Sequence, residues 1–196
     1  MKKIGLLMAF AVIFSASFAQ TEQGRMMVGG SLGLVGNTAK AKNNNTTTTQ
    51  NKEVAFSLTP QFGYFVINNL AIGLGLNLSS DTYKVPNTDY KSNTTAFQVQ
   101  PFVRYYLPMK IFFQGTAGIG SSRDKTTNYN NVTTTSKSGV SSLSLGAGYA
   151  WFLNNNVAIE PFVGYSTQRT KPENSSTKYL DSGLFLKVGF QIYLGK

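Results

Sequence analysis

The chain has no cysteine and no histidine among its 196 residues. Without cysteine it can form no disulfide framework and carries no thiol for a lipid anchor. Without histidine it lacks the commonest general base and a leading metal ligand, which excludes Ser-His-Asp catalysis, Cys–His pairs and His-bearing zinc sites. We therefore expect no catalytic residues, no metal and no cofactor, and a protein that is not an enzyme.

Charged residues and long hydrophobic runs are also scarce. Only 13% of the residues are charged, whereas about 25% is typical of soluble proteins. The hydrophobic share is 41%, yet no internal run approaches the roughly 18 apolar residues of a membrane helix. A chain with so few charges and such short apolar runs indicates a β-type membrane protein. Its length suits one domain.

The N-terminus has the pattern of a secretory signal peptide. Lys2 and Lys3 precede an apolar stretch at residues 4–14, and Ser17 and Ala19 place small side chains at the −3 and −1 positions before Gln20. We predict cleavage after Ala19, which makes residues 1–19 a signal peptide and residues 20–196 the mature domain. For an exported protein we expect no nucleic-acid partner, in spite of the net charge of +10.

The end of the chain alternates strictly between apolar and other residues. The even positions are all apolar: Leu184, Leu186, Val188, Phe190, Ile192 and Leu194. Successive side chains of a strand point to opposite faces, so this stretch has one apolar face over about 11 residues. That length spans a bilayer as a tilted strand.

Seven earlier stretches alternate in the same way. The eight predicted strands are residues 26–36, 54–64, 70–78, 97–105, 111–119, 140–151, 157–165 and 184–194. A phase change near Ser141 and Ser142 suggests a β-bulge in the sixth. Three short turns (67–69, 107–110 and 153–156) alternate with four polar loops (37–52, 80–93, 121–138 and 167–179). Short turns at one end and long loops at the other match an outer-membrane barrel.

The polar face decides whether the apolar face points inward, as in a soluble lipocalin-like barrel, or outward. It carries mainly Gly, Ser, Ala, Thr and Gln, whereas a water-facing surface would carry many Lys and Glu. Small side chains suit the narrow interior of eight strands. Near the short turns the apolar face carries Tyr64, Tyr105, Tyr149 and Trp151, as in an interfacial girdle. We predict an all-β, eight-stranded antiparallel up-and-down transmembrane β-barrel.

These features resemble the small eight-stranded outer-membrane barrel family, which includes the membrane domain of outer membrane protein A and outer membrane protein X. Residues 17–20 and the Asn/Thr-rich loops resemble Bacteroidetes-type members. The resemblance covers residues 24–196 and implies a bacterial outer-membrane location, contact with outer-membrane lipid, insertion by the barrel-assembly machinery and a monomer. Family members that modify lipid A rely on a catalytic histidine, which is absent here. Members usually end on an aromatic residue, whereas this chain ends at Gly195 and Lys196.

Three charged residues fall on inward positions of the predicted strands: Arg104, Glu160 and Lys187. One interpretation is a structural charge network in a plugged lumen, because buried charges must be paired. The other is a gate or selectivity determinant. An eight-stranded interior leaves little room for a pore, which favours the structural interpretation. The neutral partners of such a network would be Gln61, Gln98, Gln100, Gln114 and Gln191.

The predicted loops and their flanks are basic. They carry Lys40, Lys42, Lys52, Lys84, Lys91, Arg123, Lys125, Lys137, Arg169, Lys171 and Lys178. These side chains either keep the loops solvated or contact lipopolysaccharide phosphates. With the turns facing the periplasm, we expect a structural or surface-interaction role through four long extracellular loops. The alternative is a narrow porin-like channel for small solutes.

Overall fold

The computed structural model describes residues 19–43, 46–86, 88–173 and 177–195, with the backbone alone at 19 and 35–51. Apart from Ala19, the predicted signal peptide lies outside the described residues. These residues form a 3-10 helix and nine strands: η1 (Ala19–Thr21), β1 (Met26–Asn43), β2 (Thr46–Ile67), β3 (Leu70–Lys84), β4 (Lys91–Tyr106), β5 (Ile111–Thr127), β6 (Thr133–Tyr149), β7 (Trp151–Phe152), β8 (Val157–Pro172) and β9 (Tyr179–Leu194). Within the described ranges, no helix is long and apolar enough to cross a membrane.

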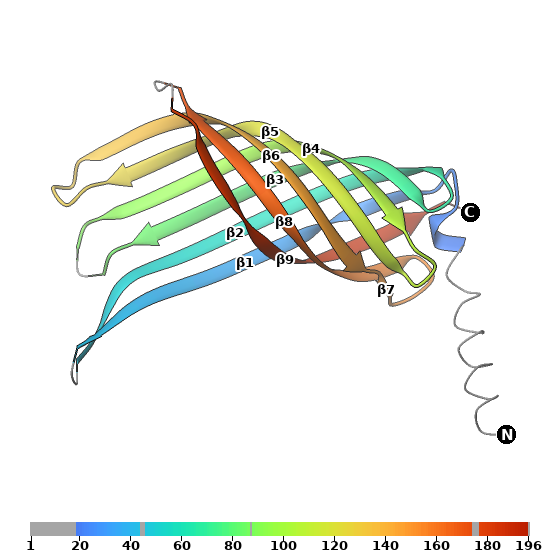
Figure 1. Cartoon of the computed structure of the whole chain (residues 1–196), viewed down its shortest axis with the longest axis horizontal. Coiled ribbons are helices and arrows are strands. Elements are labelled where there is room, and N and C mark those ends of the chain that lie inside the picture. The colour runs from blue at the N-terminus through green and yellow to red at the C-terminus, as the bar shows by residue number, and fades with distance from the viewer. Residues whose placement is uncertain (1–18, 44–45, 87, 174–176, 196) are drawn as a thin grey trace.

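The long strands close into one barrel (Figure 1). Each long strand pairs antiparallel with its neighbours in the chain, and the sheet closes where β1 pairs with β9 and β6 pairs with β8. The two-residue β7 continues the line of β6 and pairs only with the start of β8. The eight long strands confirm the predicted eight-stranded antiparallel up-and-down barrel.

The apolar faces of the strands point outward, as the alternation predicts. On β9, Leu184 is 82% exposed and Leu186 71%, whereas Gln191 is fully buried. The predicted girdle aromatics near the short turns are also exposed: Tyr64, Tyr105, Tyr149 and Trp151, at 43–64%. The outer surface is therefore apolar and the interior polar, the reverse of a soluble barrel.

The predicted bulge near Ser141 is wrong. The β5–β6 register is continuous, with Gly120 opposite Val140 and Ile119 opposite Ser141. Val140 belongs to the inward set and is only 3% exposed, so the apparent phase change is one apolar residue on the polar face. Register shifts occur instead in β1 between Ala39 and Lys40 and in β2 between Phe65 and Ile67.

The four predicted loops are shorter than expected. Strands β1 and β2 extend to residues 43 and 46, β3 and β4 to 84 and 91, β5 and β6 to 127 and 133, and β8 and β9 to 172 and 179. Figure 1 shows the resulting hairpins projecting from one end of the barrel. Backbone ladders do not require apolar side chains, and the β-branched threonines of these segments favour strands. The absence of apolar alternation therefore marked the end of the apolar band rather than the end of the strands.

Inward phenylalanines pack on inward glycines of neighbouring strands. Phe102 lies opposite Gly73, Phe112 opposite Gly148, and Phe185 opposite Gly164. A Cβ atom on Gly148 would lie 2.3 Å from the Phe112 ring, so only glycine leaves room for it. These pairs explain why the polar face is rich in glycine and how a narrow barrel holds large rings.

The hydrophobic core fills the turn end of the barrel. It includes Met27, Phe65, Ala71, Phe102, Tyr106, Phe112, Ala150, Ala158 and Tyr193. Helix η1 lies at this end, where the Thr21 hydroxyl donates to the Asn69 side-chain oxygen at 2.6 Å and the Asn69 amide donates to the Thr21 carbonyl at 2.7 Å. Asn69 adopts a φ of 67°, a left-handed conformation that asparagine tolerates in tight turns. The turn end is therefore closed.

Candidate functional site in the barrel lumen

Two of the three predicted lumen charges meet above this core. Arg104 of β4 and Glu160 of β8 point inward from opposite walls, and Nη1 of Arg104 donates to Oε2 of Glu160 at 2.6 Å. Their side chains are only 4% and 2% exposed. The strand alternation sets the inward direction of each residue, and closure of the sheet brings them together.

Two tyrosines hydrogen-bond to the two members of this pair, and the sequence analysis did not predict either of them. The Arg104 guanidinium also donates to the Tyr106 hydroxyl at 2.9 Å, and the Tyr193 hydroxyl donates to Oε1 of Glu160 at 2.6 Å. The two hydroxyl oxygens lie 2.8 Å apart. The signal was present in the sequence. Tyr106 lies two residues after Arg104, and Tyr193 lies two residues after Gln191, so the same alternation points both tyrosines inward.

The Arg104 guanidinium is enclosed on its other sides as well. Its Nε donates to Oε1 of Gln114 at 2.7 Å, and Gln114 in turn donates to the Thr116 hydroxyl at 3.1 Å. The Phe112 ring centroid lies 4.2 Å from Cζ of Arg104, within the range of a cation–π contact. Arg104 and Glu160 therefore neutralise each other within a ring of hydrogen bonds, which forms a floor across the lumen.

Lys187, the third predicted charge, stands apart from this floor. Its ammonium lies 5.2 Å from the centroid of the Phe185 ring. Among the residues that the structure describes, the Arg104–Glu160 pair is the only salt bridge, so Lys187 has no carboxylate partner there. The structure thus joins two of the three residues and leaves the third facing the lumen alone.

The inward glutamines differ in their contacts. Gln114 joins the floor, and Gln98 donates to Gln168 at 3.2 Å and accepts from the Ser142 hydroxyl at 2.7 Å. Gln191 is fully buried, and neither its Oε1 nor its Nε2 has a hydrogen-bond partner in the described part of the chain. An unpaired buried amide is uncommon, because its desolvation is uncompensated.

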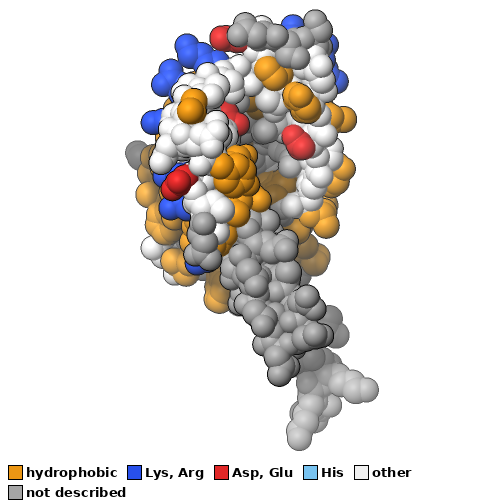
Figure 2. Space-filling model, turned by 90° about the vertical axis from the view of Figure 1, so that its left-hand side faces the viewer, with side chains coloured by type: hydrophobic (Ala, Val, Ile, Leu, Met, Phe, Trp, Pro, Cys, Tyr) orange, Lys and Arg blue, Asp and Glu red, His pale blue; other side chains and the backbone are white. Residues whose placement is uncertain are grey.

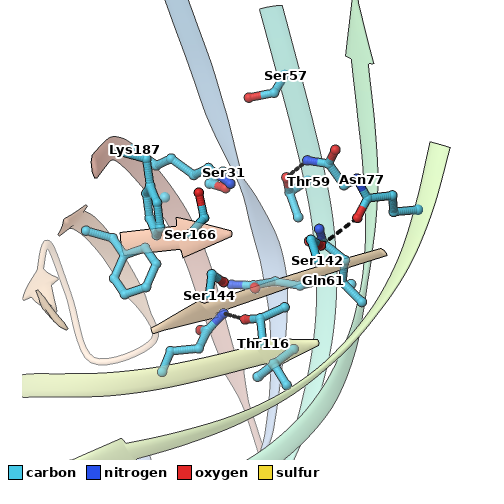
Figure 3. A pocket seen from close by; sticks show the side chains of 18 of the residues that line it. Ser31, Ser57, Thr59, Gln61, Asn77, Thr116, Ser142, Ser144, Ser166 and Lys187 are labelled. Atoms are coloured by element: carbon cyan, nitrogen blue, oxygen red, sulfur yellow. Dashed lines mark hydrogen bonds between the residues drawn. The ribbon is translucent and has the colours of Figure 1, made fainter. Parts of the chain in front are cut away.

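A cavity of about 280 Å³ lies above the floor (Figure 3). It reaches from Arg104 and Glu160 to Ser57, Ser79 and Gln168. Most of its lining side chains are hydroxyls or amides, with aromatic surface from Phe102, Phe162 and Phe185. In Figure 3 the Lys187 side chain extends into this space toward Ser31.

Near the hairpin end, the inward-facing charges are acidic. By continuation of the alternation, the inward set includes Glu53 of β2, Asp81 of β3, Asp124 of β5 and Asp181 of β9. Burial, and then the nearby Glu53 carboxylate, raise the pKa of Asp81, which lies beyond the apolar band. Within the described ranges, no three acidic residues come close enough to hold a metal ion.

The outward-facing charges at the same end are basic. They are Lys52, Lys84, Lys91, Arg123, Lys125, Lys137, Arg169 and Lys171, which we call the basic belt, and all are exposed. Figure 2, which looks onto the hairpin end, shows basic side chains along the outer margin, and acidic ones both beside the hollow and at the margin. The side chains of Lys40 and Lys42 lie outside the described residues.

Lysines of the basic belt lie directly beside one another. Lys84 is the ladder partner of Lys52 on one side and of Lys91 on the other, and Arg123 is opposite Lys137. Like charges in directly opposed positions destabilise a sheet. An anion bound between these side chains would remove that repulsion.

Comparisons with known proteins agree with this architecture. The model of the autotransporter beta-domain family matches residues 36–193, which is more than half of the chain. No curated protein resembles the chain closely enough to count as a relative.

Solved structures of outer-membrane barrels are similar to this chain. Ail, the attachment invasion locus protein of Yersinia pestis, aligns with a TM-score of 0.54 and 10% identity, over 88% of this chain and 99% of Ail. Neisserial surface protein A aligns with a TM-score of 0.48 and 17% identity, over 87% and 97% of the two chains. The translocator domain of autotransporter NalP from Neisseria meningitidis aligns with a TM-score of 0.45 and 12% identity, over 96% and 68%. At such identities the likeness to Ail concerns the fold.

Proposed function

This chain belongs to the autotransporter beta-domain family and is a bacterial outer-membrane β-barrel protein; from that premise we propose that it serves a structural and surface-interaction role by binding anionic outer-membrane lipid through its basic belt. Its four hairpins then project beyond the lipid on the cell's outer side. Short turns face the periplasm in barrels of this type.

The observation that carries this proposal is the row formed by Lys52, Lys84 and Lys91. Lys84 is the ladder partner of both other lysines on the outer face, and Lys52 lies two residues beyond Val54, where the apolar band ends on β2. Lys and Arg near a membrane surface each contribute about 1 kcal/mol of attraction to anionic lipid. Lipopolysaccharide, whose phosphates pair with such groups, is the occupant we propose.

Binding of lipopolysaccharide to the refolded barrel in zwitterionic micelles tests the proposal. The variant carrying Lys52→Gln, Lys84→Gln and Lys91→Gln should bind at least about tenfold more weakly, because three phosphate contacts are lost. Lys110→Gln, at the turn end, should bind like the wild type. Equal binding by the triple variant and the wild type would overturn the proposal.

Tilted strands extend the basic belt around the barrel. Lys91 is the ladder partner of Thr127, and Lys125 lies two residues from that position; Lys125 is in turn the partner of Thr135, two residues from Lys137. Strands of a closed barrel tilt against its axis, so side chains at one height shift along successive strands in this way. The belt therefore offers contacts on several sides of the barrel.

The proposal also includes the finer expectations from the sequence. These are a signal peptide at residues 1–19, a mature domain at 20–196, a monomer inserted by the barrel-assembly machinery, a relationship to outer membrane proteins A and X of Bacteroidetes type, and no enzymatic activity. The burial of Gln20 and Thr21 supports a mature domain that includes these two residues. The proposal does not include export of a passenger segment through the barrel, because the Arg104 floor and the core beneath it obstruct the lumen.

A narrow channel for small solutes is the second candidate, favoured by the polar cavity above the floor. The Arg104–Glu160 pair would then act as a gate. Planar-bilayer recordings of the refolded protein separate the two. A plugged barrel gives no stable single-channel steps, whereas wild-type steps that change with Arg104→Ala or Lys187→Ala would establish the channel.

A further inference from the structure

We propose that the lumen cavity binds a small neutral carbohydrate, of monosaccharide or disaccharide size. Its volume of about 280 Å³ lies just below the range of roughly 300–1,000 Å³ that accommodates drug-sized ligands. The floor formed by Arg104 and Glu160 closes the cavity on the turn side, so the ligand enters from the hairpin end and is held there.

The lining matches the chemistry of a sugar. Ligand pockets are usually lined mainly by apolar side chains, whereas this one is lined mainly by amides and hydroxyls. Amides and hydroxyls can both donate and accept hydrogen bonds, as sugar hydroxyls do. Phe162 and Phe185 add apolar surface of the kind that the C–H face of a sugar ring can cover.

Two side chains of the lining lack the partners that a folded interior normally supplies. Gln191 is fully buried with both amide atoms unpaired, and Lys187 has no carboxylate partner within the described ranges. Both belong to β9 and line the same cavity, four residues apart on the inward face. A hydroxyl-rich ligand would accept from the Lys187 ammonium, and a change of the Gln191 rotamer would bring its amide, whose atoms have no exposed surface in this structure, to the ligand.

The distribution of charge favours a neutral ligand. The inward acids Glu53, Asp81, Asp124 and Asp181 lie nearer the hairpin end and would repel an anion on entry. Lys187, the one inward cation without a carboxylate partner among the described side chains, would repel a cation. An uncharged sugar meets neither barrier.

Calorimetric titration of the refolded barrel tests this inference. The micelles must be of lauryldimethylamine oxide, because maltoside and glucoside detergents carry sugar headgroups. Glucose, galactose and maltose are titrated beside glucuronate and glucosamine, their charged counterparts. We expect saturable one-to-one binding of at least one neutral sugar and weaker binding of both charged ones. No saturation by any neutral sugar, or tighter binding of a charged one, would overturn the proposal.

Paired variants locate the site. Lys187→Met and Gln191→Leu should each weaken binding about tenfold or more, because each removes hydrogen bonds to the ligand. Lys171→Met removes the same charge from the outer face and should leave binding unchanged. Heat-modifiable gel mobility verifies folding, and Ser166→Val replaces Gln191→Leu if that variant does not fold. Binding that survives the cavity substitutions, or falls equally with Lys171→Met, would contradict a lumen site.

Discussion

Arg104 and Glu160 are 56 residues apart in the chain, yet their charged groups lie 2.6 Å apart across the barrel lumen. The two groups share a set of hydrogen bonds with Tyr106, Tyr193 and Gln114. Because the pair is almost completely shielded from solvent, each charge depends on the other.

Removal of one member of this pair should destabilise the barrel strongly. Glu160→Gln leaves the Arg104 guanidinium buried without its counter-charge, and Arg104→Met does the same to Glu160. We expect each to lower the free energy of unfolding by about 3–5 kcal/mol. Urea unfolding of the refolded barrel in micelles, followed by tryptophan fluorescence, measures this.

The double variant is the control for that prediction. With both charges absent, the combined loss should be smaller than the sum of the single losses by about 1–3 kcal/mol, the coupling expected between interacting residues. Additive losses would mean that the pair does not couple energetically and that the floor is held by packing alone.

Gly148 should not tolerate a larger side chain. Gly148→Val would force its side chain into the Phe112 ring, and overpacking of this kind costs about 1–3 kcal/mol. Gly183→Val is the matched control, because a Cβ there meets no atom within 4 Å. The urea midpoints of the two variants are compared with that of the wild type, and equal midpoints would argue against the proposed Phe–Gly packing.

Asp81 should make stability fall as the pH rises. Its raised pKa means that the folded protein holds this proton more tightly than the unfolded chain, so the contribution is lost as Asp81 ionises. Asp81→Asn should therefore stabilise the barrel at neutral pH by less than about 1 kcal/mol, because the group is partly solvated. The gain should vanish below about pH 4, the ordinary range of an aspartate pKa.

Asp124→Asn is the comparison for Asp81. The Asp124 carboxylate accepts hydrogen bonds from the Ser92 and Thr126 hydroxyls, whereas Oδ1 of Asp81 is buried without a partner in the described part of the chain. Urea midpoints across the pH range should show stabilisation for Asp81→Asn alone. Equal stabilisation by both would contradict a specific effect of Asp81 and would indicate general repulsion among the inward acids of the hairpin end.

The projecting hairpins should be protected as strands rather than exchange as loops. Residues 121–127 pair with β4 on one side and β6 on the other. Their amides should exchange with deuterium at least about tenfold more slowly than the exposed tip residue Tyr129, because local opening must break two ladders. Uniformly fast exchange over residues 121–138 would restore the loop expected from the sequence.

Much of the barrel could be predicted from alternation alone. Leu184 and Leu186 were assigned outward and Arg104 and Glu160 inward, because successive side chains of a strand must point to opposite faces. The same rule failed for residues 121–138, where the strands continue without an apolar face. Continued past the last apolar residue, the alternation would have assigned Asp124 to the inner face of the strand and Arg123 and Lys125 to the outer face.

The sequence by itself determined the class of barrel, because the two-residue period and the turn spacing are local properties of the chain. Only the tertiary structure decided that Arg104 meets Glu160, that Tyr193 joins them, and that Lys187 faces the cavity alone. Contacts across a lumen depend on how far each strand is staggered against the next, and that stagger is set by closure of the whole sheet. No local pattern of residues encodes it.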